Sequence, residues 1–446
     1  MIGKTAITIL MLTVLSVSVF SMTLNETIDY ALDNAPGLKM SFEDREMAKI
    51  DKYSSISNFL PKLTVSAGYT KLDSVPTFIM PTPLGVQEIK MAVEDNYSVD
   101  MQLSVPIFMG GKLINGYFIS RTQNEIKDLE YFRNRSDIKM AVIQMYMSGL
   151  LMEESIDMIE SLLKAKEEHL ASAKSRYEAG AASKLELLSA RTQYNAVKPR
   201  VAELENAKEN LMRSMKILIG MPFDEEIELE TSLSEISRRP KPIDISDKNE
   251  EELSAEALKE RKDINILEKN VNIVERAALM TKLAFLPNIV GFAKNSYNNI
   301  PNASQDSLII FSDTLAIDQS FTWGLSMSFD VFTGGKRVLD IMKSGHQQKQ
   351  IKMAYANMKN QIKAEVKEVH DKYNVSQMNM NTYESGLELA EEAWQMAKEQ
   401  YRQGIISNSD YLDAESGYIQ AKADYSQGLY NLIVQYYSLL NAVGLL

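Results

Sequence analysis

The stretch Phe108-Met109-Gly110-Gly111-Lys112 decides how this chain is organised, because it recurs 224 positions later as Phe332-Thr333-Gly334-Gly335-Lys336. Upstream, Phe59-Leu60-Pro61 recurs as Phe285-Leu286-Pro287 with an offset of 226. Long-period self-similarity of this kind predicts one structural unit duplicated in tandem. The offset of 224 also relates further pairs downstream: Tyr177 and Tyr401, Gly180 and Gly404, Ser183 and Ser407, and Gly220 and Gly444.

The N-terminal segment, residues 1–21, has the character of a secretory signal. Lys4 gives it a basic start, and Ala6–Val17 is an apolar run that is followed by small residues before Met22. As a transmembrane anchor this run would be short, because a spanning helix needs about 20 apolar residues. The mature chain is then expected to divide into a first repeat, a proline- and carboxylate-rich linker and a second repeat, over residues 22–220, 221–252 and 253–446.

The composition narrows the class of protein. The 446 residues carry a formal net charge of −12 and include no cysteine. An acidic chain argues against nucleic-acid binding, which needs clustered Lys and Arg to neutralise phosphates. The absence of cysteine excludes disulfides and a lipid-modified cysteine at the mature N-terminus. Because no apolar stretch after residue 21 could span a membrane as a helix, the exported chain is either soluble or enters a membrane as strands.

Each repeat contains two segments in which apolar and polar residues alternate. Period-2 alternation over about 10 residues is typical of tilted membrane β-strands. The four predicted strands cover residues 62–71, 96–107, 288–297 and 319–332. In the last of them one face is strongly apolar and is expected to contact lipid, through Phe321, Trp323, Leu325, Met327 and Phe329.

After its two strands, each repeat is predicted to contain a pair of long helices. Two shorter helices, Leu24–Asn34 and Leu38–Asn58, precede the first strand. The hairpins cover residues 110–218 and 334–442, and their apolar positions follow alternating steps of three and four, as in coiled coils. In each hairpin a glycine that ends the first helix is followed by an N-cap serine with an acidic residue three positions later. These tip residues are Gly180 and Ser183 in one hairpin and Gly404 and Ser407 in the other.

No catalytic or metal-binding pattern is found, so we predict neither an enzyme nor a cofactor. The three histidines, His169, His346 and His370, lack the spacing of metal ligands, and His169 is expected to lie on a solvated helix face. Gly110-Gly111-Lys112 lacks the spacer of a phosphate-binding loop. We interpret it as the exit from a strand into a helix.

Four strands cannot close a barrel, and an open sheet edge in lipid leaves backbone groups without hydrogen bonds. Closure therefore requires other copies of the chain. Two copies would give a barrel filled by side chains, whereas three copies would leave a lumen that the helices continue as a hollow cylinder. A long polar tube of this kind is suited to conduction.

The repeated Phe-Leu-Pro, Phe-x-Gly-Gly-Lys and Tyr-x-x-Gly patterns together make the chain resemble the TolC family of outer-membrane efflux and secretion channels. The resemblance covers the whole mature chain. It implies an α+β membrane protein of long coiled-coil helices and four strands, assembled as a homotrimer with a 12-stranded β-barrel in the outer membrane, continued by an α-helical barrel in the periplasm. It also implies two partners, a periplasmic adaptor protein that meets the hairpin tips and an inner-membrane pump that supplies the energy.

The resemblance also implies a gate at the tip of the second hairpin. Asp410 and Asp413 match the family's paired acidic ring, Tyr401 matches a tyrosine that ties this hairpin to its neighbour, and Glu186 falls at an acidic partner position. The family's gating arginine is replaced here by Ile406. The alternative for the two aspartates is that they are ordinary first-turn acids, which the helix dipole favours.

Two alternatives to a drug-efflux channel remain open from the sequence. The first is a non-conducting, structural coiled-coil surface protein, which explains the helices but leaves the alternating strands without a role. The second lies within the family, where protein secretion or metal efflux replaces drug export, because the partner pump chooses the cargo.

Overall fold

The computed structural model describes residues 19–82, 85–90, 92, 94–239, 241, 243, 245, 248–303 and 311–446. Most of the expected signal segment, residues 1–18, lies outside the described residues. Two compact units are present. The first contains Met1–Asp44, Asp128–Ile266 and Ala356–Leu446, and the second contains Arg45–Lys127 and Leu267–Tyr355.

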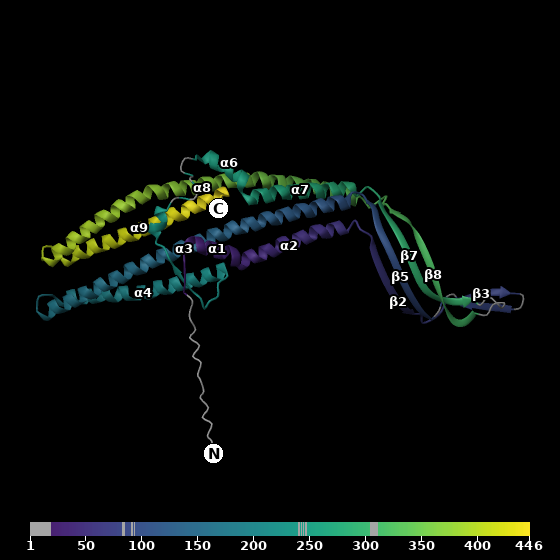
Figure 1. Ribbon diagram of the computed structural model, residues 1–446, viewed down its shortest axis with the longest axis horizontal. Helices are drawn as coiled ribbons and strands as arrows, with labels where there is room; N and C mark the ends of the chain where they lie inside the picture. The colour runs from purple at the N-terminus through teal and green to yellow at the C-terminus, as the bar shows by residue number, and fades with distance from the viewer. Residues whose placement is uncertain are drawn as a thin grey trace, which may run out of the picture. The chain divides into compact units, whose positions relative to one another are not determined.

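Helices make up most of the described chain (Figure 1). The two longest, α3 and α8, have 67 residues each, and each is followed by a helix of 36 residues, α4 and α9 respectively. The helices are α1 (Leu24–Asn34), α2 (Pro36–Ser57), α3 (Lys112–Glu178), α4 (Lys184–Ile219), α5 (Leu233–Arg238), α6 (Glu250–Glu260), α7 (Lys262–Leu283), α8 (Lys336–Arg402) and α9 (Asn408–Val443).

The strands form three sheets, of which one has four strands in the order β2-β5-β7-β8. All neighbours in it are antiparallel, and β5 of the first repeat pairs with β7 of the second. The strands are β1 (Val19–Met22), β2 (Lys62–Lys71), β3 (Thr77–Thr82), β4 (Gly85–Lys90), β5 (Asp95–Met109), β6 (Glu226–Leu229), β7 (Asn288–Ala303) and β8 (Phe311–Ser328).

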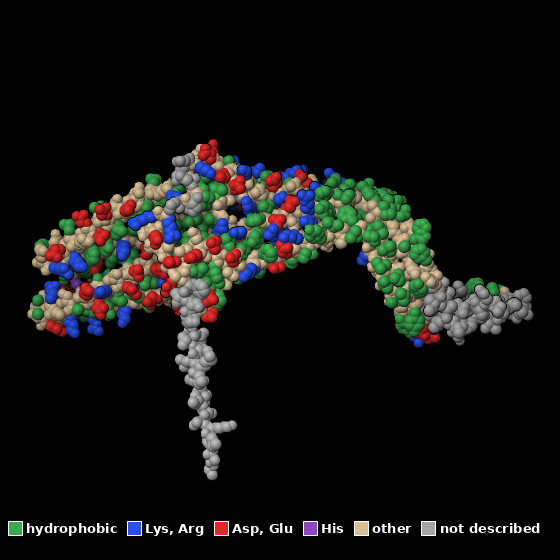
Figure 2. All heavy atoms as spheres, viewed as in Figure 1, with side chains coloured by type: hydrophobic (Ala, Val, Ile, Leu, Met, Phe, Trp, Pro, Cys, Tyr) green, Lys and Arg blue, Asp and Glu red, His purple; other side chains and the backbone are tan. Residues whose placement is uncertain are grey.

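In the second unit, the sheet has one apolar and one polar face. Strand register places the odd-numbered residues of β2, β5 and β8 on one side and the even-numbered residues on the other. The apolar side chains on β8, from Phe321 to Met327, are 65–77% exposed in the single chain. Figure 2 shows hydrophobic side chains covering much of the visible surface of these strands. An apolar sheet face left this open needs a covering that the single chain does not supply.

Three sequence predictions about element boundaries require correction. No strand was predicted between the first two strands of the first repeat, but this stretch contains the β3–β4 hairpin. The expected linker, 221–252, was given no strand and contains β6, which pairs in parallel with β1. Helix α2 begins at Pro36 and not at Leu38, because proline fits the first helical turn, where an N–H has no intrahelical partner.

The last predicted strand was also wrong at its C-terminal end. It was expected to reach residue 332, but β8 ends at Ser328, so Phe329 lies beyond the strand. The register explains this ending, because Ser328 pairs with Asn288, the first residue of β7, and Pro287 before it has no backbone N–H to donate. Beyond the strand, the guanidinium of Arg337 donates hydrogen bonds to the backbone carbonyl and the carboxylate of Asp330. The same guanidinium lies 5.9 Å from the centre of the Phe329 ring. These contacts lie in the segment that connects β8 to α8.

The core of the first unit lies where α3, α5 and α9 meet. Tyr146 of α3 is fully buried, and its hydroxyl donates a 2.9 Å hydrogen bond to the carbonyl of Met22. Gly428 on α9 leaves space for the ring of Tyr383 on α8, since a Cβ built there would lie 2.6 Å from that ring. This close approach agrees with the coiled-coil spacing predicted for the second hairpin.

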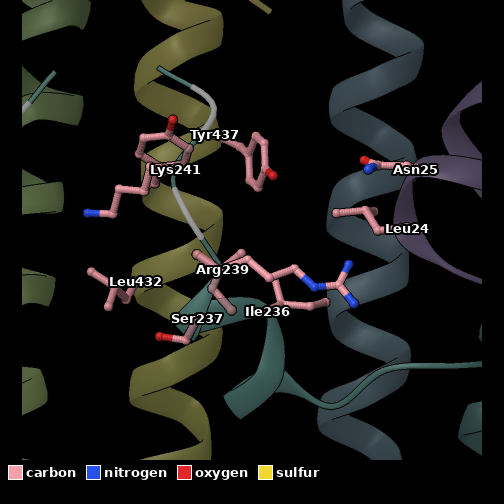
Figure 3. Close-up of a pocket in the computed structure, with 10 residues that line it drawn as sticks. Leu24, Asn25, Ile236, Ser237, Arg239, Lys241, Leu432 and Tyr437 are labelled. Carbon is pink, nitrogen blue, oxygen red and sulfur yellow. The ribbon is translucent and has the colours of Figure 1, made fainter. Parts of the chain in front are cut away.

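The linker between the repeats docks on α9 in the same unit (Figure 3). The hydroxyl of Tyr436 accepts a hydrogen bond from the backbone N–H of Ile243 and donates one to its carbonyl. The ammonium of Lys241 lies 5.0 and 5.4 Å from the ring centres of Tyr373 and Tyr436. A small pocket lies between the linker, α1 and α9. Figure 3 shows Arg239, Leu432 and Tyr437 among the residues that line it.

Among the described residues, none of the helices is apolar enough over a sufficient length to cross a membrane.

Candidate functional site: the facing ends of the two helical hairpins

The two long hairpins, α3–α4 and α8–α9, turn in the same way. Gly180 has φ 72° and Gly404 has φ 74°, which is the left-handed conformation that ends a helix. The residue after each glycine donates its N–H to a carbonyl five positions back, at 2.8 Å for Ala181 and 2.9 Å for Ile405. The repeated sequence therefore produces two matching turns.

The caps that follow the two turns differ, although their sequences predict the same pattern. Ser407 and Asp410 form a complete capping box, in which the Asp410 carboxylate accepts a 3.0 Å hydrogen bond from the Ser407 N–H. Ser183 accepts from the N–H of Glu186 at 3.1 Å, but the Glu186 carboxylate faces Arg176 instead of completing the box. Asp410 thus caps its own helix, α9, whereas Glu186 of α4 contacts Arg176 of α3.

Arg176, near the end of α3, joins the two hairpins. One guanidinium N–H donates to the hydroxyl of Tyr401 on α8 at 3.2 Å, and the same nitrogen lies 3.1 Å from the Glu186 carboxylate on α4. Tyr401 and Glu186, which the sequence analysis paired, are thus brought together through a third residue. Arg176 gives no sequence signal of this contact, because a charged residue near a helix end is common.

Deeper along the hairpins, Lys166 of α3 forms an ion pair with Glu415 of α9. Their side chains are only 11% and 5% exposed. The hydroxyl of Tyr411 donates a further hydrogen bond to Glu415 at 3.1 Å. A buried ion pair depends on such extra partners, since removing two charges from water is costly. The available sequence signal was the heptad spacing, because Lys166 falls three positions after Leu163, on the face of α3 where the apolar residues recur in steps of three and four.

His169 lies between the two groups of contacts, which corrects the expectation that it is solvated. Its ring centre is 6.4 Å from that of Tyr401 and 6.5 Å from that of Tyr411, and these two tyrosines stack at 5.2 Å. The Nε2 atom is buried without a hydrogen-bond partner. Burial lowers the pKa of His169, and the positive charge of Lys166 lowers it further. Burial beside Glu415 raises the pKa of Tyr411 to about 12.

The two aspartates predicted for the gate lie outside this cluster. Asp410 and Asp413 are both exposed in the single chain. The hydroxyl and N–H of Ser407 lower the pKa of Asp410, so its carboxylate is charged. Ile406, which replaces the expected arginine, is partly buried beside them. The part of the chain that the structure describes contains no cluster of three or more acidic, histidine or cysteine side chains placed to hold a metal ion.

The described residues thus combine a four-stranded antiparallel sheet, in which the edge strands β2 and β8 each pair with one strand, with two long helical hairpins built from the two repeats. The family model described as "Outer membrane efflux protein" matches residues 27–220 and 253–445, and the chain belongs to this family. The resemblance inferred from the repeated sequence patterns is thereby confirmed.

Individual relatives agree with this assignment. The chain is 19% identical over 432 residues to the alkaline protease secretion protein AprF of Pseudomonas aeruginosa, covering 96% of this chain and 85% of AprF. It is 20% identical over 441 residues to the outer membrane protein TolC of Vibrio cholerae, covering 97% and 93%. The solved structure of the CmeC outer membrane channel of Campylobacter jejuni superposes with a TM-score of 0.77, at 18% identity over 94% of this chain and 85% of CmeC. The α+β protomer fold predicted from the sequence is confirmed.

Proposed function

We propose that this protein is the outer-membrane channel of an efflux or secretion system, through which cargo from an inner-membrane pump and its periplasmic adaptor leaves the cell. The observation that carries the proposal is the sheet, which has an exposed apolar face and a polar face and continues into long helices. The family to which the chain belongs supports this function over a purely structural coiled coil, for which the sheet would have no use.

The proposed assembly is a homotrimer. In the described part of the chain β2 and β8 each pair with one strand, so both edges of the sheet have unpaired backbone groups. In lipid each unpaired group costs several kcal/mol, which only closure removes. Three copies, with four strands each, complete a barrel with a lumen. Chemical crosslinking of the detergent-solubilised protein should therefore stop at trimers. A crosslinking ladder that ends at dimers, or a monomer by light scattering, would exclude this assembly.

The proposed gate is held shut by the contacts between the hairpins. Arg176 supplies a cation between Tyr401 and Glu186, although Ile406 stands where the family resemblance places an arginine. In a trimer Asp410 and Asp413 would form stacked acidic rings at the periplasmic mouth. Crowded carboxylates attract cations, so this mouth would favour cations and be plugged by divalent ions. The exposed tip turns, with Gly180, Ser183, Gly404 and Ser407, are the proposed contacts of the adaptor.

Single-channel recording of variants tests the gate. Arg176→Gln should raise the closed-state conductance, because it removes the donor to Tyr401 and the cation beside Glu186. Arg200→Gln, at an exposed position on α4, is the matched control and should leave the conductance unchanged. Asp410→Asn combined with Asp413→Asn should weaken cation selectivity and divalent block. Wild-type selectivity in that double variant would mean that the two aspartates only begin a helix.

A further inference from the structure

The polar face of the four-stranded sheet carries few charges. We call the even-numbered residues of the paired strands the lumen face. Over residues 62–70, 96–104, 290–298 and 320–328, its ionisable residues are Lys62, Asp100 and Lys294. Lys62 lies opposite Ser104, at one end of this region, and Asp100 and Lys294 lie further along the strands.

Asp100 and Lys294 form an ion pair with each other. The Lys294 Nζ atom lies 3.0 Å from Asp100 Oδ1, although the two residues belong to different strands and different repeats. Strand register places Asp100 opposite Ser296 and Lys294 opposite Gln102, so the pair is diagonal across β5 and β7. The hydroxyl of Ser296, itself buried, donates a hydrogen bond to the Asp100 carboxylate and fixes its position.

This ion pair contributes little to the stability of the fold. The two side chains are 38% and 29% exposed, and ion pairs open to water contribute between 0 and about 1 kcal/mol. The electrostatic field of a charge on a channel wall does affect conduction, because it extends into the lumen over roughly one Debye length, about 8 Å at physiological salt. A charge at this position therefore attracts or repels charged cargo that passes along the wall.

We propose that Lys294 and Asp100 set the charge of the lumen at this level of the sheet and hold it neutral, so that the membrane part of the channel passes cargo of either sign. The inference rests on the proposed channel function and adds a determinant of selectivity distinct from the acidic tip. In a trimer, loss of the Lys294 charge leaves three carboxylates on the lumen wall, and loss of the Asp100 charge leaves three ammonium groups.

The absence of native cysteine makes a local test possible. Thr322 lies opposite Lys294 on β8 and is exposed, so Thr322→Cys places one reporter thiol per chain on the lumen face. In proteoliposomes, the thiol is treated separately with a cationic trimethylammonium and an anionic sulfonate methanethiosulfonate reagent, neither of which crosses the bilayer. The ratio of the two rates reports the local potential and is independent of the narrow tip.

Relative to Thr322→Cys alone, adding Lys294→Gln should raise the cation-to-anion rate ratio by about 3- to 10-fold, and adding Asp100→Asn should lower it by a similar factor. The variant with both changes should return to the starting ratio, and 1 M salt should suppress the differences, because the Debye length is then about 3 Å. Ratios that agree within about twofold across all four proteins at low salt overturn the inference.

A second reporter separates this result from a failure of the proposed function. Leu325→Cys lies on the opposite, apolar face and should react slowly with both reagents in lipid. Fast labelling of Leu325→Cys with protection of Thr322→Cys would show that the lumen face is assigned to the wrong side, which contradicts the channel itself. Fast labelling of Thr322→Cys with unchanged ratios contradicts only the role of the ion pair.

Discussion

At the scale of single residues, the histidine between the hairpins makes their contact sensitive to pH. Because burial lowers the pKa of His169, the folded protein binds this proton less readily than the unfolded chain, whose histidine titrates near 6.5. Stability is therefore unaffected above that pH and falls as the pH drops below it. The charges around the ring are Lys166 and Arg176 of α3, Glu186 of α4 and Glu415 of α9.

The corresponding prediction compares wild type with His169→Gln. The melting temperature of the wild-type protein should fall more steeply than that of the variant between pH 7 and pH 5, because glutamine binds no proton. Parallel curves for the two proteins would mean that His169 titrates in the folded state as it does in the unfolded chain.

The buried ion pair makes a second prediction at this scale. Lys166→Met leaves the Glu415 carboxylate buried without its partner and should cost about 3–5 kcal/mol, and Glu415→Leu added to it should restore most of the loss. The matched control is Lys208→Met, which breaks a more exposed α3–α4 pair with Glu153 and should cost less than about 1 kcal/mol. Denaturant unfolding followed by Trp394 fluorescence, in a Trp323→Phe background, measures all of these variants. Equal losses at Lys166 and Lys208 would argue against a special role for burial.

At the scale of elements, the two faces of β8 should respond in opposite ways to one charge. Leu325→Arg should block assembly at a cost of about 2–4 kcal/mol, if the residue lies near the middle of the bilayer. Ser326→Arg, one position along the strand, should assemble because its side chain meets water. The fraction of heat-modifiable trimer on gels measures both. Equal tolerance of the two arginines would refute the assignment of the faces.

Regular elements were predictable from the sequence because their periods are long and uninterrupted. The alternation in β8 and the heptad steps of α3 each repeat over many residues, and Gly180 and Gly404 mark the turns between the helices. The β3–β4 hairpin was not predicted, since its prolines are typical of loops. The end of β8 was not predicted, because it depends on where its partner β7 begins and not on the alternation within β8 itself.

The site was less predictable than the fold for a related reason. Tyr401 and Glu186 were found through the family resemblance, but the residue that joins them, Arg176, is 225 positions from Tyr401 in sequence. The Lys166–Glu415 pair likewise spans 249 positions. Contacts between polar side chains on separate helices depend on the packing of those helices, which a single sequence does not specify residue by residue.

At the scale of the whole molecule, the tandem duplication builds one sheet from two halves. The pairing of β5 with β7 joins the repeats, so neither repeat has a complete sheet of its own. The edges left at β2 and β8 belong to different repeats, and an edge of one copy can pair with the other edge of the next. Such head-to-tail pairing closes into a ring without altering the fold of a single chain.

Conductance measured on the purified protein in a planar lipid bilayer is the most direct test of the central claim that this chain forms a channel. The account predicts uniform steps of ionic current from wild-type trimers, with larger steps from Arg176→Gln trimers because the contact between the hairpins is weakened. Protein that is inserted and trimeric, yet conducts no current as wild type or as Arg176→Gln, would contradict it.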